Sequence, residues 1–167
     1  MTNTFDHDRL PSPPRSNDLE DRRDLDGIHI LVVDDNADAA DSMAFLLAGF
    51  GAAMRVETSG AAALTAMRHW CPDVVLLDLG MPDMSGYQVA RVLRSQPELE
   101  RLVLIALTGY GRQIDRERST EVGFDHHVTK PVDLDELRRV ILGSVSTRRA
   151  GQSPSSPSSQ DSQYSRR

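Results

Sequence analysis

The sequence predicts an α/β fold in which helices cover a mostly parallel sheet, and two observations carry this prediction. Short apolar segments alternate with segments of helical periodicity between residues 27 and 147, which is the pattern of repeated strand-helix units. The clearest apolar segment, residues 74–77, runs straight into Asp78 and a turn rich in glycine and proline. Such a run favours a strand buried on both faces, so Asp78 should lie at the rim of the sheet.

Five segments fit strands. They cover residues 28–33, 53–56, 73–77, 102–107 and 124–129. The second segment has the weakest pattern, so we expect it at an edge of the sheet. A helical pattern follows each strand. In the first helix we expect Met43, Leu46, Leu47 and Phe50 to face inward, and in the second, at residues 60–69, Leu64 and Met67. In the third helix, at residues 87–94, the expected inward-facing residues are Val89 and Leu93. In the fifth helix they are Leu134, Leu137 and Ile141, and Asp133 caps this helix. The fourth helix, residues 112–122, has few large apolar residues and should pack thinly.

The two ends of the chain differ from this middle part in composition. Residues 1–26 are rich in Asp, Arg, Pro and Ser, and residues 148–167 are rich in serine and proline. Neither segment carries enough apolar surface to offset the entropy of ordering. We therefore expect a disordered acidic arm, one folded domain at residues 27–147 and a disordered tail.

Charge and hydropathy restrict the class of protein. A net charge of -6 and a pI near 5.3 argue against a nucleic-acid partner, because binding to phosphates needs a surplus of basic residues. The apolar segments are too short to span a bilayer and the polar N-terminus does not resemble a signal peptide, so we expect a cytoplasmic protein without membrane contact. Cys71 is the only cysteine and should fill space at a helix end.

Polar residues with phosphate and metal chemistry follow four of the predicted strands. They are Asp34, Asp35, Asp78, Thr108 and Lys130, and in a parallel sheet the strand ends meet at one edge. Carboxylates about 4 Å apart repel by roughly 4 kcal/mol at an effective dielectric near 20, and a divalent cation removes this repulsion. Ligands made of oxygen alone favour Mg²⁺. A lysine and a threonine are suited to hold phosphoryl oxygens.

Each of these residues also has a purely structural interpretation. The aspartates could cap helices, Thr108 could belong to a turn, and Lys130 could be a solvated strand end. Taken together these interpretations are weak, because every strand would end by coincidence in a residue type that a phosphoryl site requires.

The motifs at these strand ends resemble one known family. They are VVDDN at residues 32–36, LLDLGMPDMSG at 76–86, ALTG at 106–109 and TKP at 129–131, and they resemble the receiver domain of bacterial two-component response regulators. The resemblance implies a flavodoxin-like (CheY-like) doubly wound fold, with five parallel strands in the order 2-1-3-4-5 and five helices. It also implies a phosphorelay switch in which Asp78 takes a phosphoryl group from a histidine kinase or a phosphotransfer protein.

The resemblance further assigns roles to single residues. Mg²⁺ would be bound by Asp35, Asp78 and the backbone carbonyl of Gly80, with Asp34 acting through water. Thr108 and Lys130 would contact the phosphoryl group, the bond between Lys130 and Pro131 would be cis, and a downstream protein would bind the face of the fourth helix, fifth strand and fifth helix. His127 occupies the switch position, where the family usually has tyrosine or phenylalanine.

Two other functions use similar residues. A Mg²⁺-dependent phosphohydrolase would also form an aspartyl phosphate, but it would need a second acid two residues after the nucleophile, where this chain has Gly80. A docking scaffold that is never phosphorylated would not require the complete set of aspartates, threonine and lysine. We therefore expect a single-domain signalling switch rather than an enzyme that turns over external substrates. The pair His126 and His127 is not expected to bind metal, because adjacent residues of a strand point to opposite faces.

Overall fold

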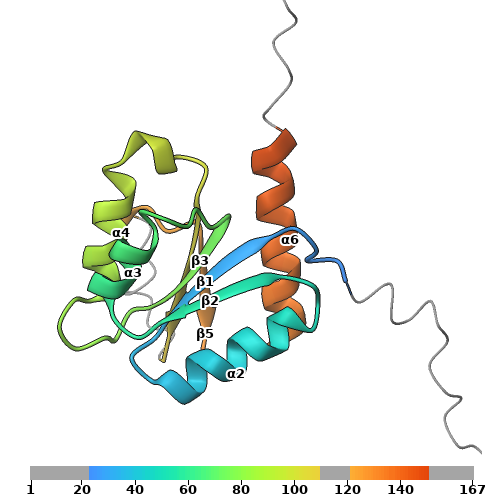
Figure 1. The fold of residues 1–167 in the computed structure, drawn as a ribbon, viewed down its shortest axis with the longest axis horizontal. Coiled ribbons are helices and arrows are strands. Elements are labelled where there is room, and N and C mark those ends of the chain that lie inside the picture. Colours follow the sequence, from blue (N-terminus) through green and yellow to red (C-terminus); the bar gives the residue numbers. More distant parts are fainter. Residues whose placement is uncertain (1–22, 110–120, 151–167) are drawn as a thin grey trace, which may run out of the picture.

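The computed structural model describes residues 23–109 and 121–150, and their strands form one five-stranded sheet, drawn as a ribbon in Figure 1. The strand order is β2-β1-β3-β4-β5, and all four neighbouring pairs are parallel. This order confirms the fold class predicted from the sequence. The strands are β1 (His29–Val33), β2 (Ala53–Glu57), β3 (Val74–Asp78), β4 (Val103–Thr108) and β5 (His126–Thr129).

Burial follows the position of each strand in the sheet. Every residue of β3 and β4 is buried, whereas β2 is only partly buried, as its place at the edge requires. Residues 53–56 have a weak hydrophobic pattern because β2 lies at the edge of the sheet, where its residues are only partly buried. The continuous apolar run of β3 reflects a central strand with helices on both faces.

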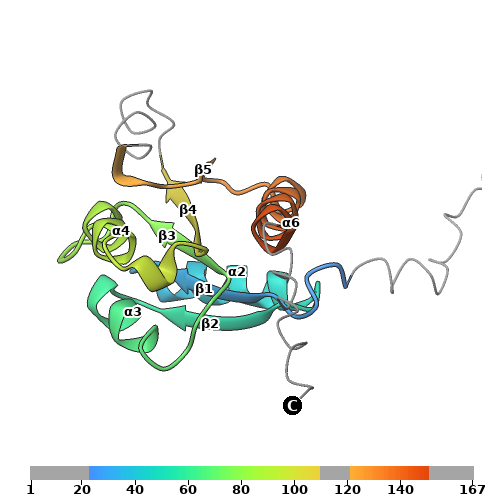
Figure 2. The same cartoon turned by 90° about the horizontal axis from the view of Figure 1, so that it is seen from above.

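Helices cover the two faces of the sheet, as Figures 1 and 2 show. The described helices are α2 (Ala37–Ala48), α3 (Gly60–Ala66), α4 (Gly86–Arg94) and α6 (Leu134–Ala150), with a short 3-10 turn at Pro97–Leu99. The helix predicted at residues 112–122 falls almost entirely outside the described residues. In the part of the chain that the structure describes, no helix is both long enough and apolar enough to cross a membrane.

Two hydrophobic clusters lie on opposite sides of the sheet because successive side chains of a strand alternate between its faces. Ile30 and Val32 pack with α2 and α6, whereas Leu31 and Val33 pack with α3 and α4. Both clusters are completed by β3 and β4, which contribute alternate residues to each. The sheet is therefore the central layer between the two clusters, and polar residues can gather where its strands end.

Side-chain caps fix where the helices begin. The side chain of Asn36 accepts from the Ala39 amide at 3.1 Å, and Ser85 forms a capping box with Gln88. The Asp133 carboxylate accepts from the Glu136 amide at 2.9 Å, as expected from the sequence. These caps place α2 and α4 directly after the acid-bearing ends of β1 and β3.

The structure corrects three local expectations. Leu25, assigned to the arm, is fully buried and belongs to the α2/α6 cluster, while α6 continues to Ala150, so the folded part extends past both ends of the range 27–147. Leu46 is 48% exposed because the core-facing side of α2 consists of Ala40, Ala44 and Leu47. Cys71 is exposed rather than packed at a helix end. In the last two cases local spacing could not tell which side of a short segment would face the sheet.

Candidate functional site

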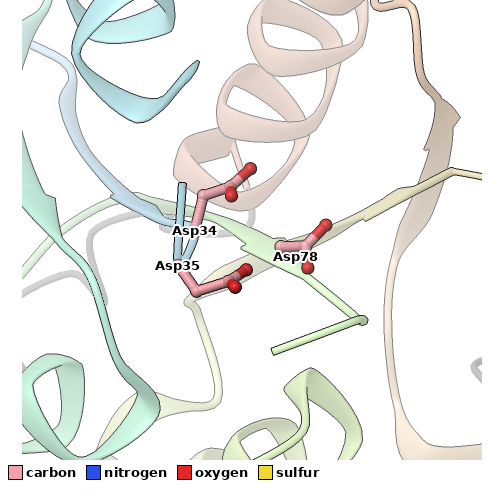
Figure 3. Close-up of side chains that lie close together, drawn as sticks. All are labelled: Asp34, Asp35 and Asp78. Atoms are coloured by element: carbon pink, nitrogen blue, oxygen red, sulfur yellow. The ribbon is translucent and has the colours of Figure 1, made fainter. Parts of the chain in front are cut away.

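The strand ends bring five predicted residues to one edge of the sheet. Asp34 and Asp35 follow β1, Asp78 and Thr108 are the last residues of β3 and β4, and Lys130 follows β5. Figure 3 shows the three aspartates beside one another at this edge. One carboxylate oxygen from each lies within 4.8 Å of the others. Asp34, Asp78 and Thr108 are buried, whereas Asp35 is exposed.

Lys130 joins the two buried carboxylates. Its ammonium Nζ lies 2.6 Å from Asp34 Oδ2 and 2.7 Å from Asp78 Oδ1. Its backbone amide donates to the Thr108 carbonyl at 2.7 Å, and the peptide bond between Lys130 and Pro131 is cis. The amide contact ties the start of the loop after β5 to the end of β4, beside the acids.

The ionisation of Lys130 reflects opposing effects. Burial of the ammonium lowers its pKa, but hydrogen bonds to Asp34 and Asp78 and the attraction of both carboxylates outweigh this and raise the pKa above its ordinary value of 10.5. The ammonium therefore stays charged at neutral pH. It acts as an internal counter-ion for two buried acids that would otherwise repel each other.

Backbone amides hold the second oxygen of each buried carboxylate. The Asn36 amide donates to Asp34 Oδ1 at 3.0 Å, and the Gly80 amide donates to Asp78 Oδ2 at 2.7 Å. The loop after Asp78 approaches its strand closely, because a Cβ on Gly86 would lie 2.4 Å from the Asp78 carbonyl oxygen. Glycine at this position lets α4 begin directly against the end of β3. Asp78 is thus fixed in position and orientation.

The three carboxylates are suited to a divalent cation. They offer only oxygen atoms, which is the donor set of Mg²⁺, and the exposed Asp35 leaves one side of the cluster open to water. The net charge of the cluster supports the same conclusion, because one lysine leaves two of the three negative charges uncompensated. The residues present therefore fit such an ion.

The two histidines lie in different surroundings, as the alternation of a strand requires. His126 Nε2 lies 2.7 Å from the Ser144 hydroxyl of α6. The ring of His127 is partly buried and lies 6.1 Å from the ring of Phe124, which itself packs edge-on against Tyr87 at 6.3 Å. His127 pairs in register with Ala106 of β4, two residues before Thr108. This places it on the strand next to Thr108.

One contact at this edge was not predicted from the sequence. The family resemblance implies a role through water for Asp34 and a role toward a phosphoryl group for Lys130, whereas the structure pairs the two directly. The signal was present, because both residues end strands that reach the same edge. The sequence did not say which carboxylate the long lysine side chain would meet.

Replacing Lys130 by methionine should destabilise the fold when divalent cations are chelated. Breaking a fully buried ion pair costs about 3–5 kcal/mol, and we expect about 2 kcal/mol here because the Lys130 side chain is 34% exposed. The raised pKa of Lys130 fixes the pH dependence: its contribution is complete below about pH 10.5 and is lost as the pH rises through the folded-state pKa.

Urea unfolding of both proteins in a chelator, at pH 8 and above pH 10.5, measures this effect. The difference between wild type and Lys130→Met should shrink at the higher pH, and added Mg²⁺ should reduce it at pH 8. Equal stability of the two proteins at pH 8 would show that the ammonium does not offset the carboxylate repulsion.

The chain is similar to known proteins over most of its described length. A family model described as the response regulator receiver domain matches residues 30–142. An uncharacterized 14.6 kDa protein of Leptolyngbya boryana is 38% identical over 112 residues, which are 67% of this chain and 86% of that protein. The DNA-binding response regulator MtrA of Mycobacterium tuberculosis is 41% identical over 108 residues, covering 65% of this chain.

The similarity to MtrA is limited to a part of that protein, because the match covers 46% of its length. One solved structure is matched over almost its whole length. It is the signal receiver domain of a signal transduction histidine kinase from Syntrophus aciditrophicus, with a TM-score of 0.69 and 29% sequence identity. That match covers 76% of this chain and 96% of the other chain. The shared part is therefore one complete domain, the sheet and helices described above.

Proposed function

Because the chain belongs to the response regulator receiver domain family, a family of signalling switches, we propose that it accepts a phosphoryl group on Asp78 in a phosphorelay. The observation that carries the proposal is the position of Asp78. It is the buried last residue of the central strand, its carboxylate touches Lys130 Nζ, and the Gly80 amide holds its other oxygen. A carboxylate fixed in this way is a nucleophile with its surroundings already arranged.

The donor is a phosphohistidine of a histidine kinase or of a phosphotransfer protein. An Asp78 carboxylate oxygen forms a bond to phosphorus while the bond between phosphorus and the histidine nitrogen breaks, and the electron pair stays on the imidazole. Lys130 and the Thr108 hydroxyl, both at the same edge, are placed to stabilise the negative charge on the transferred oxygens.

Mg²⁺ is the cofactor of this proposal. Asp35, Asp78 and the Gly80 carbonyl would hold the ion, with Asp34 acting through water. When bound, Mg²⁺ supplies positive charge that offsets the repulsion between the carboxylates and an incoming phosphoryl group. Once a phosphoryl group is on Asp78, the Lys130 ammonium, which lies at Asp34 and Asp78, would contact the phosphoryl oxygens.

Phosphorylation would be transmitted along β4 and β5. Thr108 moves toward the phosphoryl group, and His127, on the neighbouring strand, follows it inward. The output is a change of affinity for a downstream protein at the face that includes β5 and α6. The predicted fourth helix of this face lies almost entirely outside the described residues. The Phe124 ring, which lies between Tyr87 and His127, limits where the imidazole can move.

Turnover of external phosphate esters is not part of the proposal. Such an enzyme needs an acid to serve the leaving group, and Gly80 stands two residues after Asp78. A Cβ on residue 80 would lie 3.2 Å from Asp78 Oδ2, so this position is close enough for such an acid, but glycine supplies none.

The proposal is tested by exposing the full chain to acetyl phosphate and recording its intact mass. We expect the mass to increase by one phosphoryl group with Mg²⁺ and to stay unchanged when the divalent cation is chelated. Labelling that is equally fast in the chelator would contradict the metal-dependent mechanism. Absence of labelling with both acetyl phosphate and a phosphorylated phosphotransfer protein would contradict the function itself.

A further inference from the structure

A cavity lies at the edge of the sheet opposite Asp78, where β3 and β4 begin and α6 ends. Its volume is about 240 Å³, and it is lined by Asp73, Arg101, Val103, Val145, Arg148 and Arg149. Asp73 comes five residues before Asp78, so a rise of about 3.3 Å per residue separates the cavity from the phosphoacceptor by roughly 17 Å. The cavity is therefore a separate site and not an extension of the acidic edge.

The lining of this cavity has the opposite charge to the chain as a whole. Three guanidinium groups face one carboxylate, although the whole protein carries a net charge of -6. Arg148 is held in place, because it donates to the Glu100 carbonyl and to the Asp125 carboxylate. This acid lies outside the cavity, and Arg148 shares it with Arg94.

The other two arginines are weakly compensated. Arg149 lies 3.3 Å from Asp73 Oδ1 and 3.2 Å from the Gly27 carbonyl, and its side chain is 56% exposed. The second oxygen of Asp73 accepts from the His29 amide at 2.9 Å, which ties this acid to the sheet. Arg101 is exposed and makes no ion pair with the described residues. The contacts of Arg149 attach the end of α6 to the sheet. They do not account for the presence of a second arginine, Arg101, in the lining of the cavity.

The remaining wall of the cavity is apolar. Val103 and Val145 are 1% and 5% exposed, so they form a firm surface between the arginines. A volume of about 240 Å³ is below the range of about 300–1,000 Å³ that is typical of drug-sized ligands. It suits a phosphate with a small organic group, and guanidinium groups bind phosphate with paired hydrogen bonds.

We propose that this cavity binds a small phosphomonoester, with its phosphate between Arg101 and Arg149 and its organic part against Val103 and Val145. Arg149 would share its charge between the phosphate and Asp73. The chemical class of the ligand follows from the combination of arginines and an apolar wall, because inorganic phosphate would contact the arginines but not the two valines. This inference does not depend on phosphorylation of Asp78.

Amide NMR titration of the full chain tests the proposal with three probes, namely phenyl phosphate, phenol and inorganic phosphate. Phenyl phosphate should shift the amides of Val103 and Val145 in a saturable manner. Phenol should cause no such shift, and inorganic phosphate should bind more weakly. Shifts confined to the residues around Asp78 and Lys130 would instead place the phosphate at the acidic edge and overturn the proposal.

Two arginine variants make the test specific. Loss of a charge-assisted contact to phosphate should weaken binding about tenfold or more in Arg101→Gln, and this exposed residue should not affect folding. Arg91→Gln, an exposed arginine of α4 on the other face of the sheet, should bind like the wild type. Equal binding by Arg101→Gln and the wild type would overturn the site, and inorganic phosphate binding as tightly as phenyl phosphate would overturn its assignment to phosphomonoesters.

Discussion

Replacing Asp78 by asparagine is expected to abolish phosphoryl incorporation, whereas the wild type gains one phosphoryl group per chain. An amide oxygen is a poor nucleophile and carries no charge for a cation, so the variant loses both the bond-forming group and a metal ligand. The fold should survive, because the change removes one of three clustered negative charges and keeps the shape of the side chain. Intact-mass measurement after acetyl phosphate and Mg²⁺ gives the result directly.

Asp83→Asn is the matched control for this experiment. Asp83 lies in the loop after β3, five residues from Asp78, and is exposed. It should be labelled like the wild type. If Asp78→Asn were labelled as fully as the control, another side chain would be the acceptor, and the burial of Asp78 would have only a structural purpose. Peptide mapping of the labelled variant would then identify that acceptor.

The sheet could be predicted from the sequence because its signals are local. β1, β3 and β4 are mostly apolar and each is followed by polar residues, whereas the edge strands β2 and β5 include Arg55, His126 and His127 and carry a weaker signal. The strand order, however, is a property of the whole chain and entered through the resemblance of four motifs to one family. The family match confirms the resemblance, and the observed order β2-β1-β3-β4-β5 confirms the predicted strand order.

The side-chain contacts were less predictable than the strands. The sequence placed Asp34, Asp78 and Lys130 at one edge, but their pairing depends on distances of 2.6 and 2.7 Å that arise only when three strands are aligned. The exposed Leu46 shows the same limit, since two leucines in succession at residues 46 and 47 fit either side of a helical stripe. Small residues, Ala40 and Ala44, mark the inward face of α2 because the helix lies close to the sheet.

Leu25 is the residue for which the composition of a segment was most misleading. The segment around it is rich in charged residues, which predicted an arm without fixed structure, yet Leu25 is fully buried. Its amide donates to the Phe50 carbonyl at 3.0 Å, and the preceding Asp24 lies 3.4 Å from Arg138 of α6. One apolar residue with these contacts attaches the segment to both α2 and α6.

Leu25→Ala should therefore lower the free energy of unfolding by about 2–5 kcal/mol, the range for removing a buried leucine side chain. The loss combines the apolar surface no longer buried with the cavity left among the residues of the α2/α6 cluster. Urea unfolding should show a lower midpoint with an unchanged slope. Leu46→Ala removes the same atoms from a residue that is 48% exposed, and it should change stability by less than about 0.5 kcal/mol. Equal effects of the two substitutions would mean that residues 23–26 are not part of the folded domain, and the boundary at residue 27 would then stand.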